Sequence, residues 1–360
     1  MRAAELGIAI GRLPAGPAGA ITDVAGVRVG HTTLIEGDTV RTGVTVVLPH
    51  GGNPGKDPLF AGCHRLNGNG ELTGLEWVRE SGLLTSPIGL TNTYSVGVVR
   101  DALVATELTE GLPVVGETWD GGLNDIRGQH VRAGHVDAAL AEARAAPEGA
   151  PVAEGGVGGG TGMICHGFKG GIGTASRVVA ADVGGYTVGV LVQANYGRRE
   201  RLRVDGLPVG ELVGDAEIPL PRELSDDPPR SPGSGSIIVV LATDAPLLPG
   251  QCDRIAQRAG FGIARTGGVG EHTSGDLIIA FATGNRGLGA DGRELPVRML
   301  ADRHLTPLFD AVIDATEEAI LNALLAGTTM RGYHGTVYAL TAEALVGAMT
   351  RLGRPPAKRT

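Results

Sequence analysis

The order of apolar and polar positions divides the chain into short strands and amphipathic helices. Residues 27–33 and 42–48 are rich in β-branched side chains, and the second run is almost continuously apolar, which is typical of a buried strand. Helix-period patterns cover 72–81, 96–108, 136–145, 249–259 and 307–326. Further strand patterns cover 174–180, 187–193, 237–243, 261–265 and 277–283.

Proline and glycine mark the boundaries of this pattern. Pro249 and Pro307 stand in the first turn of two helical segments, where a proline is tolerated, and Gly260 and Gly327 follow their ends. Residues 214–235 have little period and hold five prolines and three aspartates. That composition predicts an exposed, linker-like segment.

Glycine is the unusual feature of the composition. The chain has 60 glycines in 360 residues, more than twice the average usage of about 7%. They gather in clusters such as 155–162 and 167–173, which suggests tight turns and closely packed backbones. The 155–162 cluster contains no G-x-G-x-x-G, and the chain has no G-K-[S/T], so nucleotide binding is disfavoured.

Charge, cysteine and histidine exclude several other functions. The net charge of −8 argues against a nucleic-acid partner, and the arginines between 198 and 203 are interpreted as a solvated loop. Three scattered cysteines without C-x-x-C and nine histidines without H-E-x-x-H predict neither a disulfide framework nor a metal site. There is no signal-peptide pattern and no apolar run of about 18 residues, so we expect a cytoplasmic protein without a membrane segment.

The junction between the linker-like segment and the strand at 237–243 can carry chemistry. Ser236 precedes a strand and lacks the G-x-S-x-G of a nucleophile elbow. If Gly235 allows a bent backbone, the Ser236 hydroxyl could attack the preceding carbonyl, and hydrolysis would create a new N-terminal serine. Its α-amine, with a reference pKa of about 8, could then act as a general base. The alternative is an inert Gly-Ser linker.

A resemblance that extends over longer segments favours the catalytic interpretation of Ser236 over the inert linker. The sequence resembles the DmpA-type family of L-aminopeptidase/D-esterases, which includes the β-aminopeptidases, from about residue 5 to 350. The segments that carry the likeness, in family order, are ITDVAGVRVGHTT, RTGVTVVLPHGG, NGNGELTGLEWV, ETWDGGLNDI, EGGVGGGTGMICHGFKGGIGTASR, GVLVQANYG, GSIIVVLATDAPLLPGQ, TSGDLIIAFATGN and ATEEAILNALLAG.

The resemblance implies a fold and a maturation step. The fold would be a four-layer α/β/β/α sandwich, similar in layering to N-terminal-nucleophile hydrolases, forming one catalytic domain over residues 1–360. Family members cleave themselves at a Gly-Ser bond. Here that bond joins Gly235 to Ser236, giving an α chain of residues 1–235 and a β chain of residues 236–360. Ser236 would be both the agent of cleavage and the catalytic nucleophile.

The resemblance also assigns site residues. Ser274 and Asp276 match the S-G-[D/E] motif of the family, and alternation along an extended chain puts the two on one side. Asn195 matches the oxyanion-hole segment. Glu117 and Trp119 match the substrate-pocket region and would recognise the substrate's ammonium. Related sequences often carry an aromatic residue where this chain has Gly122, so substrate preference does not carry over directly.

We therefore expect a self-processing serine aminopeptidase. It would act through an acyl-Ser236 intermediate on short peptides, amides or esters with a free N-terminal amine. The resemblance implies no metal or organic cofactor and a homo-oligomer, commonly a tetramer of αβ units. The alternatives are an amidase or acyltransferase on the same scaffold, both usually threonine-based, and a non-catalytic small-molecule binder.

Overall fold

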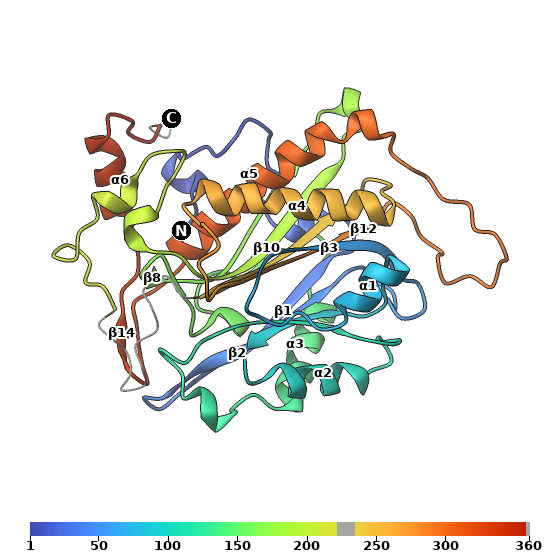
Figure 1. Cartoon of the computed structure of the whole chain (residues 1–360), viewed down its shortest axis with the longest axis horizontal. Coiled ribbons are helices and arrows are strands. Elements are labelled where there is room, and N and C mark those ends of the chain that lie inside the picture. Colours follow the sequence, from blue (N-terminus) through green and yellow to red (C-terminus); the bar gives the residue numbers. More distant parts are fainter. Residues whose placement is uncertain (222–234, 358–360) are drawn as a thin grey trace.

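The chain folds into two β-sheets that lie face to face between two layers of helices. A computed structural model describes residues 1–221 and 235–357. Figure 1 shows α4 and α5 over the outer face of one sheet and α2 and α3 beneath the outer face of the other. The architecture is the four-layer α/β/β/α sandwich that the resemblance implied.

The smaller sheet has four strands in the order β1-β2-β5-β6. Their bounds are Arg28–Glu36 (β1), Val40–Leu48 (β2), Ile88–Asn92 (β5) and Val114–Thr118 (β6). β1 and β2 form an antiparallel hairpin, whereas β5 and β6 run parallel. The parallel pair is joined through α2 (Val96–Val104), as a crossover between parallel strands requires.

The larger sheet has six strands in the order β4-β3-β12-β11-β10-β9. Their bounds are Leu83–Leu84 (β4), Leu59–Gly68 (β3), Gly275–Ala282 (β12), Ser236–Thr243 (β11), Thr187–Asn195 (β10) and Gly171–Val178 (β9). β11 and β12 are parallel neighbours at the centre, and each pairs antiparallel with its other neighbour. The starts of β11 and β12 and the end of β10 therefore lie side by side at the same end of the sheet.

Alternation along the strands builds three apolar layers. In β11, Ile238 faces the other sheet and Val239 faces α4 and α5; in β2, Val47 faces the space between the sheets and Val46 faces α2 and α3. The remaining bounds are Leu75–Ser81 (α1), Ala133–Ala145 (α3), Pro249–Arg265 (α4), Thr306–Leu325 (α5), Ala342–Arg351 (α6), Ile164–Cys165 (β7), Phe168–Lys169 (β8), Met330–Gly332 (β13) and Gly335–Val337 (β14).

One sequence prediction is wrong at α4. We expected a helix over 249–259, ended by Gly260, and a strand over 261–265, but α4 continues to Arg265. A Cβ at Gly262 would lie 2.6 Å from Cβ of Thr316 in α5 and 2.8 Å from the carbonyl oxygen of Ile313. Glycine is needed at position 262 because α4 and α5 pack closely there. Gly260, the expected helix end, lies inside the helix, where a Cβ would be in ordinary contact with Leu66 of β3 at 3.7 Å.

The expected linker-like segment 214–235 lies partly outside the described residues. Residues 214–221 are mostly exposed, although Ile218 is buried, and Gly235 at the far end is buried as well. The expectation for 222–234 falls outside the residues that the structure describes. Among the described residues, we find no helix with the length and apolar character to cross a membrane.

Candidate active site

Ser236 is the first residue of β11, at the end of the sheet where the ends of three strands lie side by side. Its neighbours in register are Asn195, the last residue of β10, and Gly275, the first residue of β12. Ser236 is buried, and its Oγ accepts a hydrogen bond from the backbone N–H of Gly275 at 3.1 Å. Strand pairing and a backbone donor therefore fix the position of this hydroxyl.

Gly235 fits where any side chain would collide with β10. A Cβ at this position would lie 2.0 Å from the carbonyl oxygen of Asn195 and 3.1 Å from Cα of Tyr196. The sequence suggested that glycine allows unusual backbone angles here. Among the described residues, the structural reason for glycine is the close approach of Gly235 to the end of β10.

The side chains around Ser236 divide between the two faces of the sheet. Ser236 alternates with Ile237, which faces the helices, and so lies on the face that is turned toward the smaller sheet. In β12, Leu277 faces the smaller sheet and Ile278 the helices, so Asp276 lies on the helix side. The Ser236 hydroxyl and the Asp276 carboxylate therefore lie on opposite faces of the sheet. Each accepts a backbone N–H from the neighbouring strand: the hydroxyl from Gly275 and the carboxylate from Ile237.

Ser274 and Asp276 form a buried pair on the helix side. Ser274 Oγ donates to Asp276 Oδ1 at 2.5 Å, and the same carboxylate accepts the backbone N–H of Ile237, the residue after Ser236. Burial raises the pKa of Asp276 to about 6 against the opposing effect of these two hydrogen bonds. The carboxylate thus stands beside the backbone of Ser236, where cleavage would create an α-amine.

Asn195 projects its amide between the two sheets. Its Oδ1 accepts the N–H of Ile164 at 2.7 Å, and its Nδ2 donates to the carbonyl oxygen of Trp119 at 3.0 Å. An amide nitrogen carries two hydrogens, and one remains after the bond to Trp119. A neutral donor fixed beside a nucleophile is what an oxyanion hole needs.

Glu117, at the end of β6, approaches β12 from the opposite sheet. Its carboxylate accepts the N–H of Glu71 at 3.0 Å and the hydroxyl of Thr93, and it is buried. Gly70 separates this carboxylate from β12: a Cβ at Gly70 would lie 3.2 Å from both Glu117 Oε1 and Cα of Gly275. Only Gly70 therefore lies between the Glu117 carboxyl group and Gly275, the residue whose N–H donates to Ser236.

Trp119 belongs to an aromatic cluster that sequence reasoning found only in part. Its ring and that of Tyr94 form a T-shaped pair with centroids 5.3 Å apart, and the Arg127 guanidinium lies 5.9 Å from the Tyr94 centroid. The indole also packs over Gly121, where a Cβ would lie 2.6 Å from the ring. Tyr94 gave no signal in sequence, because it lies in the polar stretch TNTYS, outside every motif.

The loop that carries Gly122 is held by a distant hairpin. The carbonyl oxygens of Gly122 and Leu123 accept the backbone N–H groups of His334 and Tyr333 at 3.3 and 2.8 Å. These two residues form the turn between β13 and β14, near the C-terminus. Gly122 thus lies beneath a hairpin turn that carries Tyr333.

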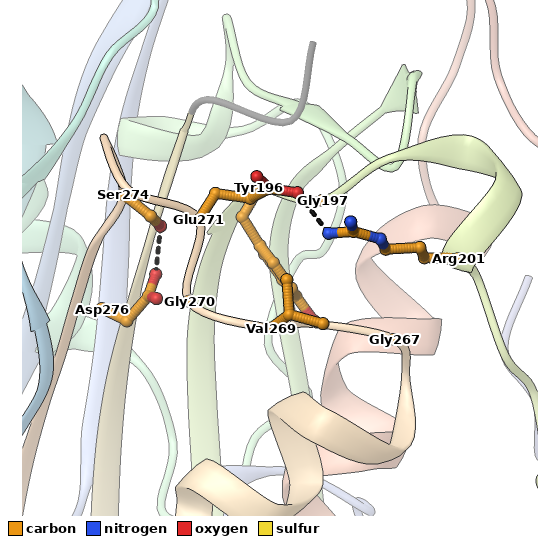
Figure 2. Close-up of a pocket in the computed structure, with 9 residues that line it drawn as sticks. All are labelled: Tyr196, Gly197, Arg201, Gly267, Val269, Gly270, Glu271, Ser274 and Asp276. Atoms are coloured by element: carbon orange, nitrogen blue, oxygen red, sulfur yellow. Dashed lines mark hydrogen bonds and ion pairs between the residues drawn. The ribbon is translucent and has the colours of Figure 1, made fainter. Parts of the chain in front are cut away.

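A small pocket opens on the helix side of β12. It is lined by Tyr196, Gly197, Arg201, Gly267, Val269, Gly270, Glu271, Ser274 and Asp276. Figure 2 shows Ser274 and Asp276 on one side of this pocket and Arg201 on the other, with the Val269–Glu271 stretch between them. The Ser236 hydroxyl and this pocket are therefore on opposite faces of the same two strands.

A family comparison matches most of the chain. The model for peptidase family S58 matches residues 19–338. The chain is 48% identical over 353 residues to the beta-peptidyl aminopeptidase BapA of Sphingosinicella microcystinivorans, covering 93% of this chain and 88% of that protein.

Two solved structures share the whole architecture. A beta-aminopeptidase of Burkholderia sp. has a TM-score of 0.90 and 54% identity, covering 99% of this chain and 100% of that one. The L-aminopeptidase D-Ala-esterase/amidase of Ochrobactrum anthropi has a TM-score of 0.87 and 41% identity, with 99% of each chain covered. The latter is described as a prototype for the serine aminopeptidases and a variant of the Ntn hydrolase fold.

Proposed function

The chain belongs to peptidase family S58 and is a serine aminopeptidase, and on that premise we propose how it matures and which residues act. The chain cuts itself between Gly235 and Ser236, giving residues 1–235 and 236–360. Ser236 then attacks the substrate carbonyl and forms an acyl-Ser236 ester, which water hydrolyses. The observation that carries the proposal is the position of Ser236. Its Oγ accepts the Gly275 N–H, it pairs in register with Asn195, and the preceding Gly235 packs against the end of β10.

In the proposed mechanism, the Ser236 α-amine transfers the proton and Asp276, on the helix side of the sheet, assists it. The α-amine of mature Ser236 takes the proton from its own hydroxyl and passes it to the leaving nitrogen. Asp276, which already accepts the adjacent N–H of Ile237, orients that amine and stabilises its charged form, and Ser274 holds the carboxylate. The second N–H of Asn195 Nδ2 stabilises the developing oxyanion.

Substrate recognition rests on the opposite sheet. The Glu117 carboxylate binds the ammonium of the N-terminal residue, and Trp119 with Tyr94 forms an apolar wall beside it. The names of the Sphingosinicella and Burkholderia relatives make β-aminoacyl groups the first class of substrate to test, alongside L-aminoacyl amides and D-aminoacyl esters.

The assembly and location of the protein are also part of the proposal. We expect a tetramer of αβ units, measurable by light scattering on the purified protein. We also expect a cytoplasmic location. Cys63, Cys165 and Cys252 are free and buried, which fits a reducing compartment.

Replacing Ser236 tests the proposed function. Ser236→Ala should stay at full length by intact mass and lose turnover, since it lacks both the cleaving hydroxyl and the nucleophile. Ser234→Ala is the matched control, two residues earlier, and should be cut and active like the wild type. A wild-type protein that is active at full length would contradict self-processing, and an active Ser236→Ala would contradict the nucleophile.

A further inference from the structure

Lys169 is a buried lysine that the proposed mechanism does not use. It lies in β8, and its Nζ donates to the carbonyl oxygens of Gly160, Met163 and Gly170 at 3.3, 3.0 and 2.8 Å. A neutral amine has two N–H groups and an ammonium has three, so three acceptors favour the charged form. Burial acts in the opposite direction and lowers the pKa of Lys169 to about 7.

One of these carbonyl groups belongs to the peptide that holds Asn195. The Met163–Ile164 peptide accepts the Lys169 ammonium at its C=O and donates its N–H to Asn195 Oδ1 at 2.7 Å. The C=O and N–H of a trans peptide point in opposite directions, so this peptide lies between the ammonium and the amide. Two hydrogen bonds therefore connect Lys169 to the proposed oxyanion donor.

The Ile164 N–H decides which way the Asn195 amide points. An N–H can donate to the amide oxygen but not to the amide nitrogen, so this bond keeps Oδ1 on the Ile164 side. The nitrogen is then turned toward Trp119, whose carbonyl oxygen accepts one of its two hydrogens. A flipped amide would present an oxygen to the developing oxyanion and repel it. The orientation of the Met163–Ile164 peptide is thus a condition for the oxyanion role.

Backbone hydrogen bonds hold the same turn without Lys169. The Gly170 N–H also donates to the Met163 carbonyl oxygen, at 2.9 Å, and the Met163 N–H donates to the Gly160 carbonyl oxygen at 3.3 Å. Strands β7 and β8 pair antiparallel on either side of the turn. Loss of the ammonium should therefore leave the turn folded, while the Met163 carbonyl keeps one donor in place of two.

We propose that Lys169 is a positioning residue that orients and polarises the Asn195 amide through the Met163–Ile164 peptide. The inference rests on the proposed oxyanion role of Asn195 and adds a residue that acts through it. A charged donor on the C=O makes the Ile164 N–H a stronger donor, because hydrogen bonds in a chain polarise one another. The Asn195 nitrogen is then held toward the oxyanion, and its remaining N–H becomes a better donor.

Lys169→Met tests the proposal, because methionine is also long and unbranched but donates no hydrogen bond. For an aminoacyl amide, kcat should fall about tenfold and KM should stay within about twofold of the wild-type value, since the oxyanion forms only in the transition state. Lys169→Gln keeps neutral N–H donors and should have an intermediate kcat. Each kcat is expressed per mole of chain cleaved before Ser236, measured by intact mass.

A double-mutant cycle separates positioning from general support of the fold. In an Asn195→Ala background, Lys169→Met should lower kcat by less than about twofold further, because the amide through which it acts is absent.

Arg177→Met is the matched control for the loss of a buried cation. Arg177 lies toward the other end of β9, where it pairs in register with Val188, and it donates to two carbonyl oxygens and to Glu318. This variant should unfold at lower temperature but keep a kcat within about twofold of the wild type. A tenfold loss of kcat in Arg177→Met would show that destabilisation alone accounts for the effect of Lys169→Met.

The failures of the two proposals can be told apart. An unchanged kcat in Lys169→Met, or the same fractional loss with and without Asn195, would overturn the positioning role. If Lys169→Met does not fold, the same cycle is run with Lys169→Gln and judged in the same way. A wild-type kcat in Asn195→Ala alone would instead count against the proposed oxyanion role, and with it against the inference that depends on it.

Discussion

The two faces of the β11–β12 pair differ in what they place around one serine. The face toward the smaller sheet carries the Ser236 hydroxyl, the Asn195 amide and, across the gap, the Glu117 carboxylate. The helix-side face carries the Ser274–Asp276 pair. In the proposed mechanism, period-two alternation thus separates an acyl side from an amine side, although all these groups lie close to one strand end.

This separation teaches how one residue can have two roles. A serine inside a chain offers only its side chain to the acyl face, and its backbone nitrogen is tied up in a peptide bond. Once the bond is cut, the nitrogen becomes an amine next to Ile237, whose N–H already bonds to Asp276. Cleavage would therefore link the Ser236 hydroxyl on one face to Asp276 on the other through the new α-amine.

Asn195→Ala would remove the donor on the acyl face and gives the largest expected effect in this comparison. We expect kcat to fall roughly 100- to 1000-fold with little change in KM, because the amide acts on the oxyanion and not on bound substrate. Steady-state kinetics on an aminoacyl amide measures both constants.

Gln193→Ala is the control for this prediction. Gln193 lies on the same face of β10, two residues earlier, and its amide donates to Thr91 and Thr118. Both variants lose a buried amide, so both should unfold at lower temperature, but Gln193→Ala should keep most of the wild-type kcat. Equal losses of kcat would show that Asn195 only supports the structure.

Glu117→Gln would test the face toward the smaller sheet, because glutamine has nearly the same shape as glutamate but cannot carry a negative charge. The amide can still accept the Glu71 N–H, so we expect the fold to hold while kcat/KM for amine substrates drops about 10- to 100-fold. An analogue with a hydroxyl in place of the substrate's amine should lose much less. An equal drop for both substrates would contradict the role in ammonium binding.

Asp276→Asn would test the amine side through pH dependence. In the proposed mechanism, activity needs the neutral Ser236 amine and so should rise with pH through the pKa of that amine. A carboxylate at Asp276 would favour the charged ammonium and raise that pKa, so removing it should move the rising limb of kcat/KM to lower pH by roughly one unit. The plateau should also fall, by roughly tenfold, because the amine is less well oriented.

A structural role for Asp276 would give a different profile. Its loss would then lower the plateau and leave the midpoint of the rising limb in place. Ser274→Ala provides an intermediate, since it removes the 2.5 Å hydrogen bond to the carboxylate but keeps the charge. We expect it to lower activity with little shift of the limb.

Local sequence signals were enough for the strands that form the site. Runs of β-branched residues predicted strands over 237–243 and 277–283, and the structure has β11 and β12 there with starts one and two residues earlier. Alternation within three residues put Ser274 and Asp276 on one side, and they form a hydrogen bond. These are short-range properties that the chain encodes locally.

Contacts between distant segments could not be obtained in the same way. Nothing in the sequence shows that Gly70 separates Glu117 from Gly275, or that Glu271 pairs with arginines some seventy residues earlier. The donor to Ser236 is a backbone N–H, which has no residue signature. Gly262 of α4 gave no usable signal for the same reason, because what requires glycine there is a contact with another helix.

Identifying the acylated atom tests the central claim most directly. The purified enzyme is mixed with an aminoacyl ester, quenched in acid within the first turnover, and mapped by mass spectrometry after digestion. The account predicts a peptide that begins at Ser236 and carries the acyl group on that serine's Oγ. An acyl group on another residue, or on Ser236 inside a full-length active chain, would contradict it.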